Sequence, residues 1–192
     1  SGEGLPEFIV KDIPPVSSSP DIKISKPEIY FGELSSDYAI VKTKVPEFNY
    51  PTSEGNVYTS YEGSGGVSLS SLFSKAVFAM KFRSEKILLS TDITSGSKIL
   101  YYRNIMERAR KIAPFLIYDP DPYIVVSKDG RLYWIIDAYT VSNMVPYAKP
   151  LNNKINYMRN SVKVVVDAYD GSVSFYVSDP DDVIIKVYES IF

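Results

Sequence analysis

An α+β fold, with helices packed on a largely antiparallel sheet, is predicted by two features of the sequence. The last third contains five short runs of β-branched and aromatic residues, and Asp129-Gly130 and Asp170-Gly171 lie between neighbouring runs. Asp-Gly pairs tolerate positive φ and favour tight hairpins, so these strands are expected to be antiparallel. The middle third instead repeats apolar residues at the i, i+3, i+4 and i+7 spacing of a helix. Helical and strand patterns grouped in this way indicate an α+β architecture.

The chain is expected to begin with an extended arm over residues 1–27. Five prolines and the run Ser17–Ser19 fall within this stretch. Proline fixes φ and removes a backbone donor, which disfavours both a helix and a central strand. The remainder, with the arm, is expected to form a single domain over residues 1–192.

Two short strands and a long loop are predicted after the arm. The strands are Ile29–Phe31 and Tyr38–Val41, separated by Gly32 and a polar turn. Residues 44–66 contain several prolines and glycines and are expected to form a loop, interrupted by one short strand at Val57–Tyr61.

Helices are predicted in the middle and at the end of the chain. The first covers the apolar stripe from Leu69 to Met80, with Ser68 as its N-cap, and Ser84–Leu89 is a short second helix. The third is expected over Ser97–Lys111, where the apolar positions are Ile99, Tyr102, Ile105, Met106, Ala109 and Ile112. A closing helix is expected with Asp179 as its N-cap and Pro180 at its first position.

The strands of the last third follow from period-two patterns and from the turns between them. The predicted strands are Phe115–Tyr118, Tyr123–Ser127, Leu132–Tyr139, Val162–Ala168 and Val173–Val177. A weak internal repeat is also present, since Ile136–Tyr139 reads like Val166–Tyr169 and each segment belongs to a strand next to an Asp-Gly hairpin.

The composition excludes several classes of function. The chain has 0 Cys and 0 His, which removes thiol nucleophiles, imidazole bases, Ser-His-Asp triads and the usual zinc sites. A net charge of −2 provides no basic surface for nucleic acid. Charged residues interrupt every apolar run before it reaches the ~20 residues that span a bilayer. No cofactor, metal or nucleic-acid partner is therefore predicted.

A binding surface is predicted on the aromatic strands. Alternation along Leu132–Asp137 places Tyr133, Ile135 and Asp137 on one face, opposite a second apolar face. Tyrosine combines apolar area with a polar tip and suits sugar or protein contacts, although packing in the core also explains it. Together with the two Asp residues of an Asp-Pro turn and the repeated segments, the candidate binding residues are Asp119, Asp121, Asp137, Asp167, Tyr133, Tyr139 and Tyr169.

Three other motifs suggest chemistry, and each has a structural explanation that we favour. Ser95 and Lys98 have the spacing of Ser/Lys acyl-transfer enzymes, but a serine here also caps a helix. The acidic segments 119–122 and 179–182 offer carboxylates for calcium or for glycoside hydrolysis, although Asp-Pro is also a common turn. The glycine-rich segment 63–66 lacks the lysine of a P-loop and fits a tight crossing of the chain.

Long stretches of the chain resemble uncharacterised protein family 0182, a group of large bacterial membrane proteins. The matching stretches are Val10–Pro15, Pro27–Leu34, Val57–Val67, Ile99–Ile105, Lys111–Leu116, Tyr133–Tyr139 and Arg159–Tyr169. The resemblance implies a parent protein with N-terminal membrane helices and a large extracytoplasmic region that contains this chain. It assigns no catalytic residue.

The two ends also suggest part of a longer protein. The chain starts with Ser1-Gly2 instead of Met, and the apolar rhythm from Val183 to Ile191 continues to the last residue. The leading hypothesis is therefore a non-catalytic extracytoplasmic binding module in the cell membrane. Its expected partners are the rest of its own protein, an envelope polymer or another protein. The alternative is a cell-envelope hydrolase that uses Asp carboxylates or a Ser/Lys pair.

Overall fold

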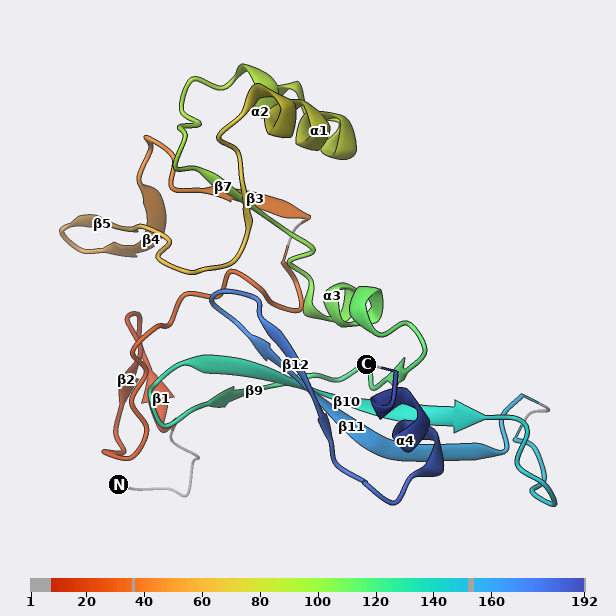
Figure 1. Cartoon of the computed structure of the whole chain (residues 1–192). Helices are drawn as coiled ribbons and strands as arrows, with labels where there is room; N and C mark the ends of the chain where they lie inside the picture. The colour runs from red at the N-terminus through yellow and green to blue at the C-terminus, as the bar shows by residue number, and fades with distance from the viewer. Residues whose placement is uncertain (1–7, 36, 152–153, 192) are drawn as a thin grey trace.

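The computed structural model describes residues 8–35, 37–151 and 154–191. Four helices pack on sheets whose paired strands all run antiparallel within these ranges, which confirms the predicted α+β class. Figure 1 shows a long lower sheet that carries α3 and α4, and an upper part that contains α1 and α2. The described strands form four separate sheets instead of the one sheet expected.

The lower sheet has the order β12-β11-β10-β8, and β9 also pairs with β10. Gly130 and Gly171 have φ of 82° and 74° in the turns on either side of the β10–β11 pair, so both Asp-Gly hairpins are confirmed. The strands agree with the predicted ones apart from their ends; they are β8 (Ile117–Tyr118), β9 (Tyr123–Val126), β10 (Leu132–Ser142), β11 (Tyr157–Asp167) and β12 (Val173–Val177).

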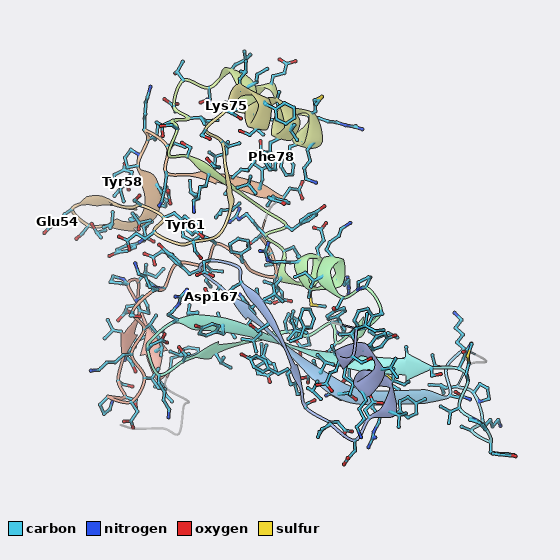
Figure 2. All side chains as sticks on the ribbon, viewed as in Figure 1. Glu54, Tyr58, Tyr61, Lys75, Phe78 and Asp167 are labelled. Carbon is cyan, nitrogen blue, oxygen red and sulfur yellow. The ribbon has the colours of Figure 1, made fainter. Side chains whose placement is uncertain are left out.

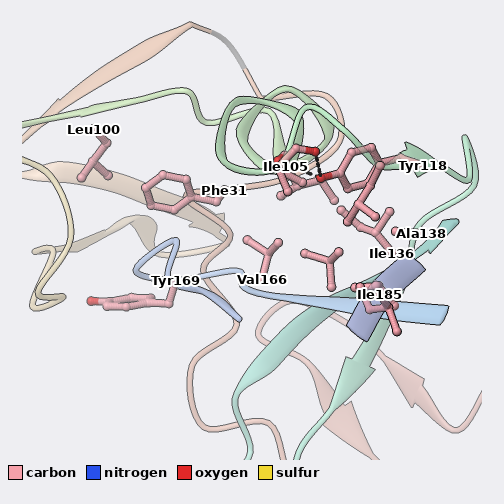
Figure 3. Close-up of a cluster of buried hydrophobic side chains, with 14 of the residues drawn as sticks. Phe31, Leu100, Ile105, Tyr118, Ile136, Ala138, Val166, Tyr169 and Ile185 are labelled. Atoms are coloured by element: carbon pink, nitrogen blue, oxygen red, sulfur yellow. Dashed lines mark hydrogen bonds between the residues drawn. The ribbon is translucent and has the colours of Figure 1, made fainter. Parts of the chain in front are cut away.

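One face of this sheet is buried under α3 (Ile105–Ile112) and α4 (Val183–Glu189). Alternation along each strand sends every second side chain into this core. Figure 3 shows the cluster, in which the side chains without exposed surface include Ile105, Ala109, Ile136, Ala138, Val164 and Val166. The remaining side chains of each strand point to the opposite face of the sheet.

The upper part has its own three-stranded sheet, in the order β3-β7-β6, covered by two helices. Its second core consists of Leu69, Phe78, Ile87, Ile93 and Ile99. Its elements are β3 (Tyr38–Val41), β6 (Val67–Ser68), β7 (Lys98–Tyr101), α1 (Leu72–Phe82) and α2 (Glu85–Leu89), so both helices predicted before residue 90 are confirmed.

The helix predicted over Ser97–Lys111 is wrong in its first half. Residues 98–101 form β7, which pairs with β3 and β6, and the helix begins only at Ile105 behind the N-cap Asn104. Ile99 and Leu100 are both completely buried, although they point to opposite sides of a strand. A strand buried on both faces reads as a continuous apolar run, which periodicity alone does not distinguish from a helix.

The N-caps predicted for the first and last helices are each displaced by one turn. The N-cap of α1 is Ser71, whose hydroxyl accepts from the backbone N–H of Ser74, and not Ser68. The N-cap of α4 is Asp182, whose carboxylate accepts from the N–H of Ile184, and not Asp179. In each case a later side chain satisfies an N–H group of the first turn. The serine expected to cap a helix before Lys98 is instead followed by β7.

Two further predictions in the first third need correction. Within the expected loop 44–66, β4 (Glu47–Thr52) and β5 (Gly55–Thr59) form a hairpin in which Pro51 lies opposite Asn56. Proline is tolerated there because a two-stranded sheet has only edge strands. Residues 29–31 do not form a regular strand; instead, the N–H groups of Tyr30 and Phe31 both donate to the Ala168 carbonyl at 2.9 Å.

The described part of the arm contains a small hairpin of β1 (Val10–Lys11) and β2 (Val16–Ser17). It then runs extended to the turn between β9 and β10, where the Ser25 N–H donates to the Gly130 carbonyl at 2.9 Å. Residues 1–7 of the predicted arm lie outside the described residues.

Candidate binding surface

The face of the lower sheet opposite α3 and α4 is an aromatic surface with two polar clusters. Cross-strand partners define it, since Ile135 lies opposite both Tyr123 and Val165, and Lys163 lies opposite Tyr176. We call this surface the outer sheet face; it comprises Tyr123, Tyr133, Ile135, Asp137, Tyr139, Lys163, Val165, Asp167 and Tyr176. Tyr123 and Tyr176 keep 50% and 57% of their surface exposed at its margins.

Three of the predicted binding residues come together in the first polar cluster. Asp137 forms an ion pair with Lys163 on the neighbouring strand. Tyr139 donates from its hydroxyl to Asp119 at 3.3 Å, and the backbone N–H of Asp119 donates to the Asp137 carbonyl at 2.8 Å. The second oxygen of Asp119 accepts from the N–H of Asp121, which closes a turn. The remaining residue of the segment, Asp121, is exposed on that turn.

The electrostatics of this cluster do not favour proton transfer. The hydrogen bond that Lys163 donates to Asp137 raises the pKa of Lys163, so the ammonium stays charged beside the carboxylate. Burial, followed by the nearby charge of Asp119, raises the pKa of Tyr139 above its usual value of 10.0. The tyrosine therefore remains protonated at neutral pH and acts as a hydrogen-bond donor to Asp119.

The second cluster holds the hairpin between β11 and β12. Asp167 accepts from the N–H groups of Tyr169 and Asp170 at 2.8 and 3.0 Å and forms an ion pair with Arg131 at 2.6 Å. Tyr133 lies directly opposite Asp167 in the ladder. Only 3% of Asp167 is exposed, and Figure 2 places it between the upper and lower parts, so this carboxylate stabilises the turn and is not available to a ligand.

Tyr169 is separated from the other candidates. Its ring stacks on Tyr61 at a centroid distance of 5.3 Å and meets Tyr30 edge to face at 5.3 Å. Its hydroxyl accepts from the N–H of Glu62 at 2.9 Å. The side chain is 7% exposed and joins the upper and lower parts of the molecule, so it is not equivalent to Tyr139, which lies within β10.

The Ser/Lys pair does not form a catalytic site. Ser95 is exposed in a turn, whereas Lys98 is on β7 and donates to the carbonyls of Ser64 and Gly65 at 3.1 and 3.4 Å. A cavity of about 430 Å³ lies between α3, α4 and β12, but its lining is almost wholly apolar. None of the candidate carboxylates lines it, so the hydrolase alternative gains no support from this cavity.

The acidic segments and the glycine loop have structural roles. Asp119 and Asp179 each accept from the N–H two residues further on, at 3.0 and 3.1 Å, so both Asp-Pro-Asp segments form the same turn. Across the described ranges, no three acidic side chains come together as a set of calcium ligands. In the glycine loop, a Cβ on Gly65 would lie 2.1 Å from the Asp170 carbonyl oxygen, which confirms a tight chain crossing.

Arg131 and Lys163 are important polar residues that the sequence did not single out. Arg131 follows an Asp-Gly turn, and alternation along β11 places Lys163 on the outer sheet face. Their ion pairs with Asp167 and Asp137 follow only from the register between β10 and β11. Asp182 belongs to the acidic segment 179–182 considered for calcium or glycoside hydrolysis, but in the structure it anchors α4. The Asp182 carboxylate lies under α4, where it accepts from the hydroxyls of Thr140, Ser161 and Tyr157. Burial opposes its ionisation, but these donors and the Ile184 N–H lower its pKa to about 2.

The model of the Uncharacterised protein family (UPF0182) matches residues 1–192. Relatives described as UPF0182 proteins from Geotalea uraniireducens, Trichlorobacter lovleyi and Pelobacter propionicus are 67%, 66% and 68% identical to the chain over 192 residues. The match covers 100% of this chain but 21% of each relative, so the chain spans about a fifth of their length. No solved structure matches the chain. Within the described ranges, no helix has the length and apolar character that crossing a membrane requires.

Proposed function

Because the chain belongs to the uncharacterised protein family UPF0182, we propose that it is a non-catalytic interaction module of a bacterial membrane protein. In this proposal the module lies outside the cytoplasm and contacts the remainder of its own protein. The extracytoplasmic location rests on the resemblance to the family.

The outer sheet face is the observation that carries the binding role. It presents Tyr123, Ile135 and Tyr176 beside a neutralised Asp137–Lys163 pair, on the side of the sheet that α3 and α4 leave open. Aromatic area with paired charges is the composition of protein interfaces, in which unpaired charges are disfavoured. The carboxylates of Asp119 and Asp167 each hold a turn through backbone N–H groups, which supports a surface that binds without catalysis.

The rest of the same protein is the partner that we favour, ahead of an envelope polymer or a separate protein. About four fifths of the length of each relative lies outside the matched region. A covalently connected partner is present at high effective concentration, so even a modest surface is occupied.

Site-specific photocrosslinking in the full-length protein tests this proposal. We expect a benzoylphenylalanine at Tyr176 to crosslink to a distant segment of the same polypeptide, identified by mass spectrometry. The matched control is the same label at Tyr147, a fully exposed tyrosine in the loop between β10 and β11, where we expect no such crosslink. Crosslinks from Tyr176 only to water or to a glycan would contradict the proposal.

A further inference from the structure

Helix α1 is apolar on both of its sides. Phe78 packs into the second core, and Figure 2 shows it on the side of α1 that faces β3 and β7. Successive residues of a helix are rotated by about 100° around its axis. On the side of α1 away from Phe78, the apolar side chains therefore span about 140° of the helix circumference. We call this arc the outer face of α1; it consists of Leu72, Phe73, Ala76, Val77 and Met80.

The outer face of α1 is exposed despite its composition. Leu72, Phe73 and Met80 retain 73%, 79% and 74% of their surface, and the neighbouring Leu89 of α2 retains 71%. A helix that is hydrophobic all round is normally buried on all sides, in a core or in a membrane. The apolar stripe that predicts α1 from the sequence is therefore the side that lacks a partner in the described structure.

The exposed charges on α1, α2 and the link between them are mostly positive. Lys81, Arg83 and Lys86 are exposed there beside the single acid Glu85, whereas Lys75 lies on the other side of α1 and donates to the Ile93 carbonyl at 3.4 Å. Lys81 lies at the edge of the face, with its ammonium 4.9 Å from the centre of the Tyr102 ring. Lys111 approaches the same ring at 5.6 Å. Two ammonium groups therefore gather near the C-terminal end of α1, where an anion would reduce their repulsion.

We propose that the outer face of α1 and Leu89 insert into the interface of an anionic lipid bilayer. Apolar side chains above a basic rim are the pattern of helices that lie in the plane of a membrane surface. The face projects outward, because α1 lies at one end of the molecule (Figure 1) and Leu72, Phe73 and Met80 are each more than 70% exposed. A projecting apolar face fits a deformable lipid surface. This contact is separate from the outer sheet face, so it stands independently of the proposed function.

Vesicle co-sedimentation of the 192-residue chain tests the lipid contact. We expect binding to phosphatidylglycerol vesicles that decreases with salt, and much weaker binding to phosphatidylcholine vesicles. The double substitution Phe73→Ser/Met80→Gln should weaken binding about tenfold or more, because two inserted side chains are lost. The matched control is Phe8→Ser/Met144→Gln, which removes side chains of the same types that are 81% and 84% exposed elsewhere.

Binding that is lost in the first double variant and kept in the control supports the proposal, provided that circular dichroism shows both variants folded. Equal binding to the two lipids, no binding to either, or full binding by the Phe73/Met80 variant would overturn it. If vesicles are not bound and the same variant instead disrupts contacts within the full-length protein, the outer face of α1 is a protein interface and the lipid proposal is wrong.

Discussion

Asp182 shows how a single buried carboxylate connects the closing helix to the large sheet. It caps α4 through the Ile184 N–H at 3.0 Å and accepts from Ser161 at 2.5 Å and from Tyr157 at 2.6 Å. The residue has no exposed surface, so an unpaired charge there would be strongly destabilising. The set of donors makes the ionised form the stable one, which links the attachment of α4 to pH.

Asp182→Asn should destabilise the protein by an amount that depends on pH. The pKa of the carboxyl is about 2 in the folded protein and 3.8 in the reference state, so the ionised group contributes stability above about pH 4. This contribution is lost as the pH falls from about 4 through 2. We expect the substitution to lower the free energy of unfolding by about 2 kcal/mol at pH 7 and by less near pH 2.5, as measured by urea unfolding.

The control for this measurement is Asp181→Asn, because Asp181 is exposed beside the same helix. It should change the free energy of unfolding by less than about 0.5 kcal/mol at either pH. An equal loss at both pH values in the Asp182 variant would show that packing, and not the charge, connects α4 to the sheet.

At the scale of elements, the β11–β12 hairpin depends on Gly171. The residue has φ of 74°, and a Cβ at this position would lie 2.6 Å from the ring of Phe31, which is itself 1% exposed. Gly171→Ala therefore combines a left-handed backbone with overpacking of the core, and we expect a loss of about 2–4 kcal/mol in urea unfolding.

Gly96→Ala provides the comparison for that hairpin. A Cβ at Gly96 would have no neighbour closer than 3.8 Å, so we expect a change within about 0.5 kcal/mol. If Gly171→Ala is tolerated as well as Gly96→Ala, the hairpin must be able to adopt another turn, and the close contact with Phe31 does not determine it.

Elements whose local pattern agrees with their final environment were predictable from the sequence. The strands β10 and β11 have a period-two pattern, and β10 begins and β11 ends beside an Asp-Gly turn. Both exist as predicted, although β10 continues to Ser142 and β11 begins at Tyr157. Strand β7 was not predictable, because Ile99 on one face packs into the second core and Leu100 on the other packs into the cluster of the lower sheet, which removes the alternation. The helix α1 was predicted from a stripe that turns out to face outward, since periodicity identifies a helix without identifying its partner.

The outer sheet face was predictable only in part, because alternation within one strand does not determine which residues of another strand lie beside it. Alternation correctly placed Tyr133 and Asp137 on one face of β10. The pairing of Asp137 with Lys163 depends on the register of two strands far apart in sequence, which turn chemistry and alternation do not determine. Tyr169 has the same local sequence context as Tyr139, but the turn after β11 directs it into the core.

At the scale of the whole molecule, the upper part has its own second core and also contributes side chains to the core of the lower part. Phe31, Tyr61 and Leu100 belong to the same buried cluster as Val164 and Tyr169 of the lower part. Polar contacts reinforce this junction. The indole N–H of Trp134 donates to the Phe31 carbonyl at 3.0 Å, and Arg108 donates to the carbonyls of Gly171 and Tyr101 at 2.6 and 3.2 Å.

This shared core leads us to expect that the chain unfolds as one cooperative unit. Trp134 is the single tryptophan and reports on the lower sheet and the junction, whereas the helical circular dichroism includes α1 and α2 of the upper part. In urea, the two signals should therefore have the same midpoint. Tyr61→Ala should shift both midpoints downward together, corresponding to about 3 kcal/mol, because Tyr61 is completely buried. Two separate midpoints in the unsubstituted chain would mean that the parts are independently stable; midpoints that separate only in the Tyr61 variant would place the coupling in the tyrosine cluster that joins them.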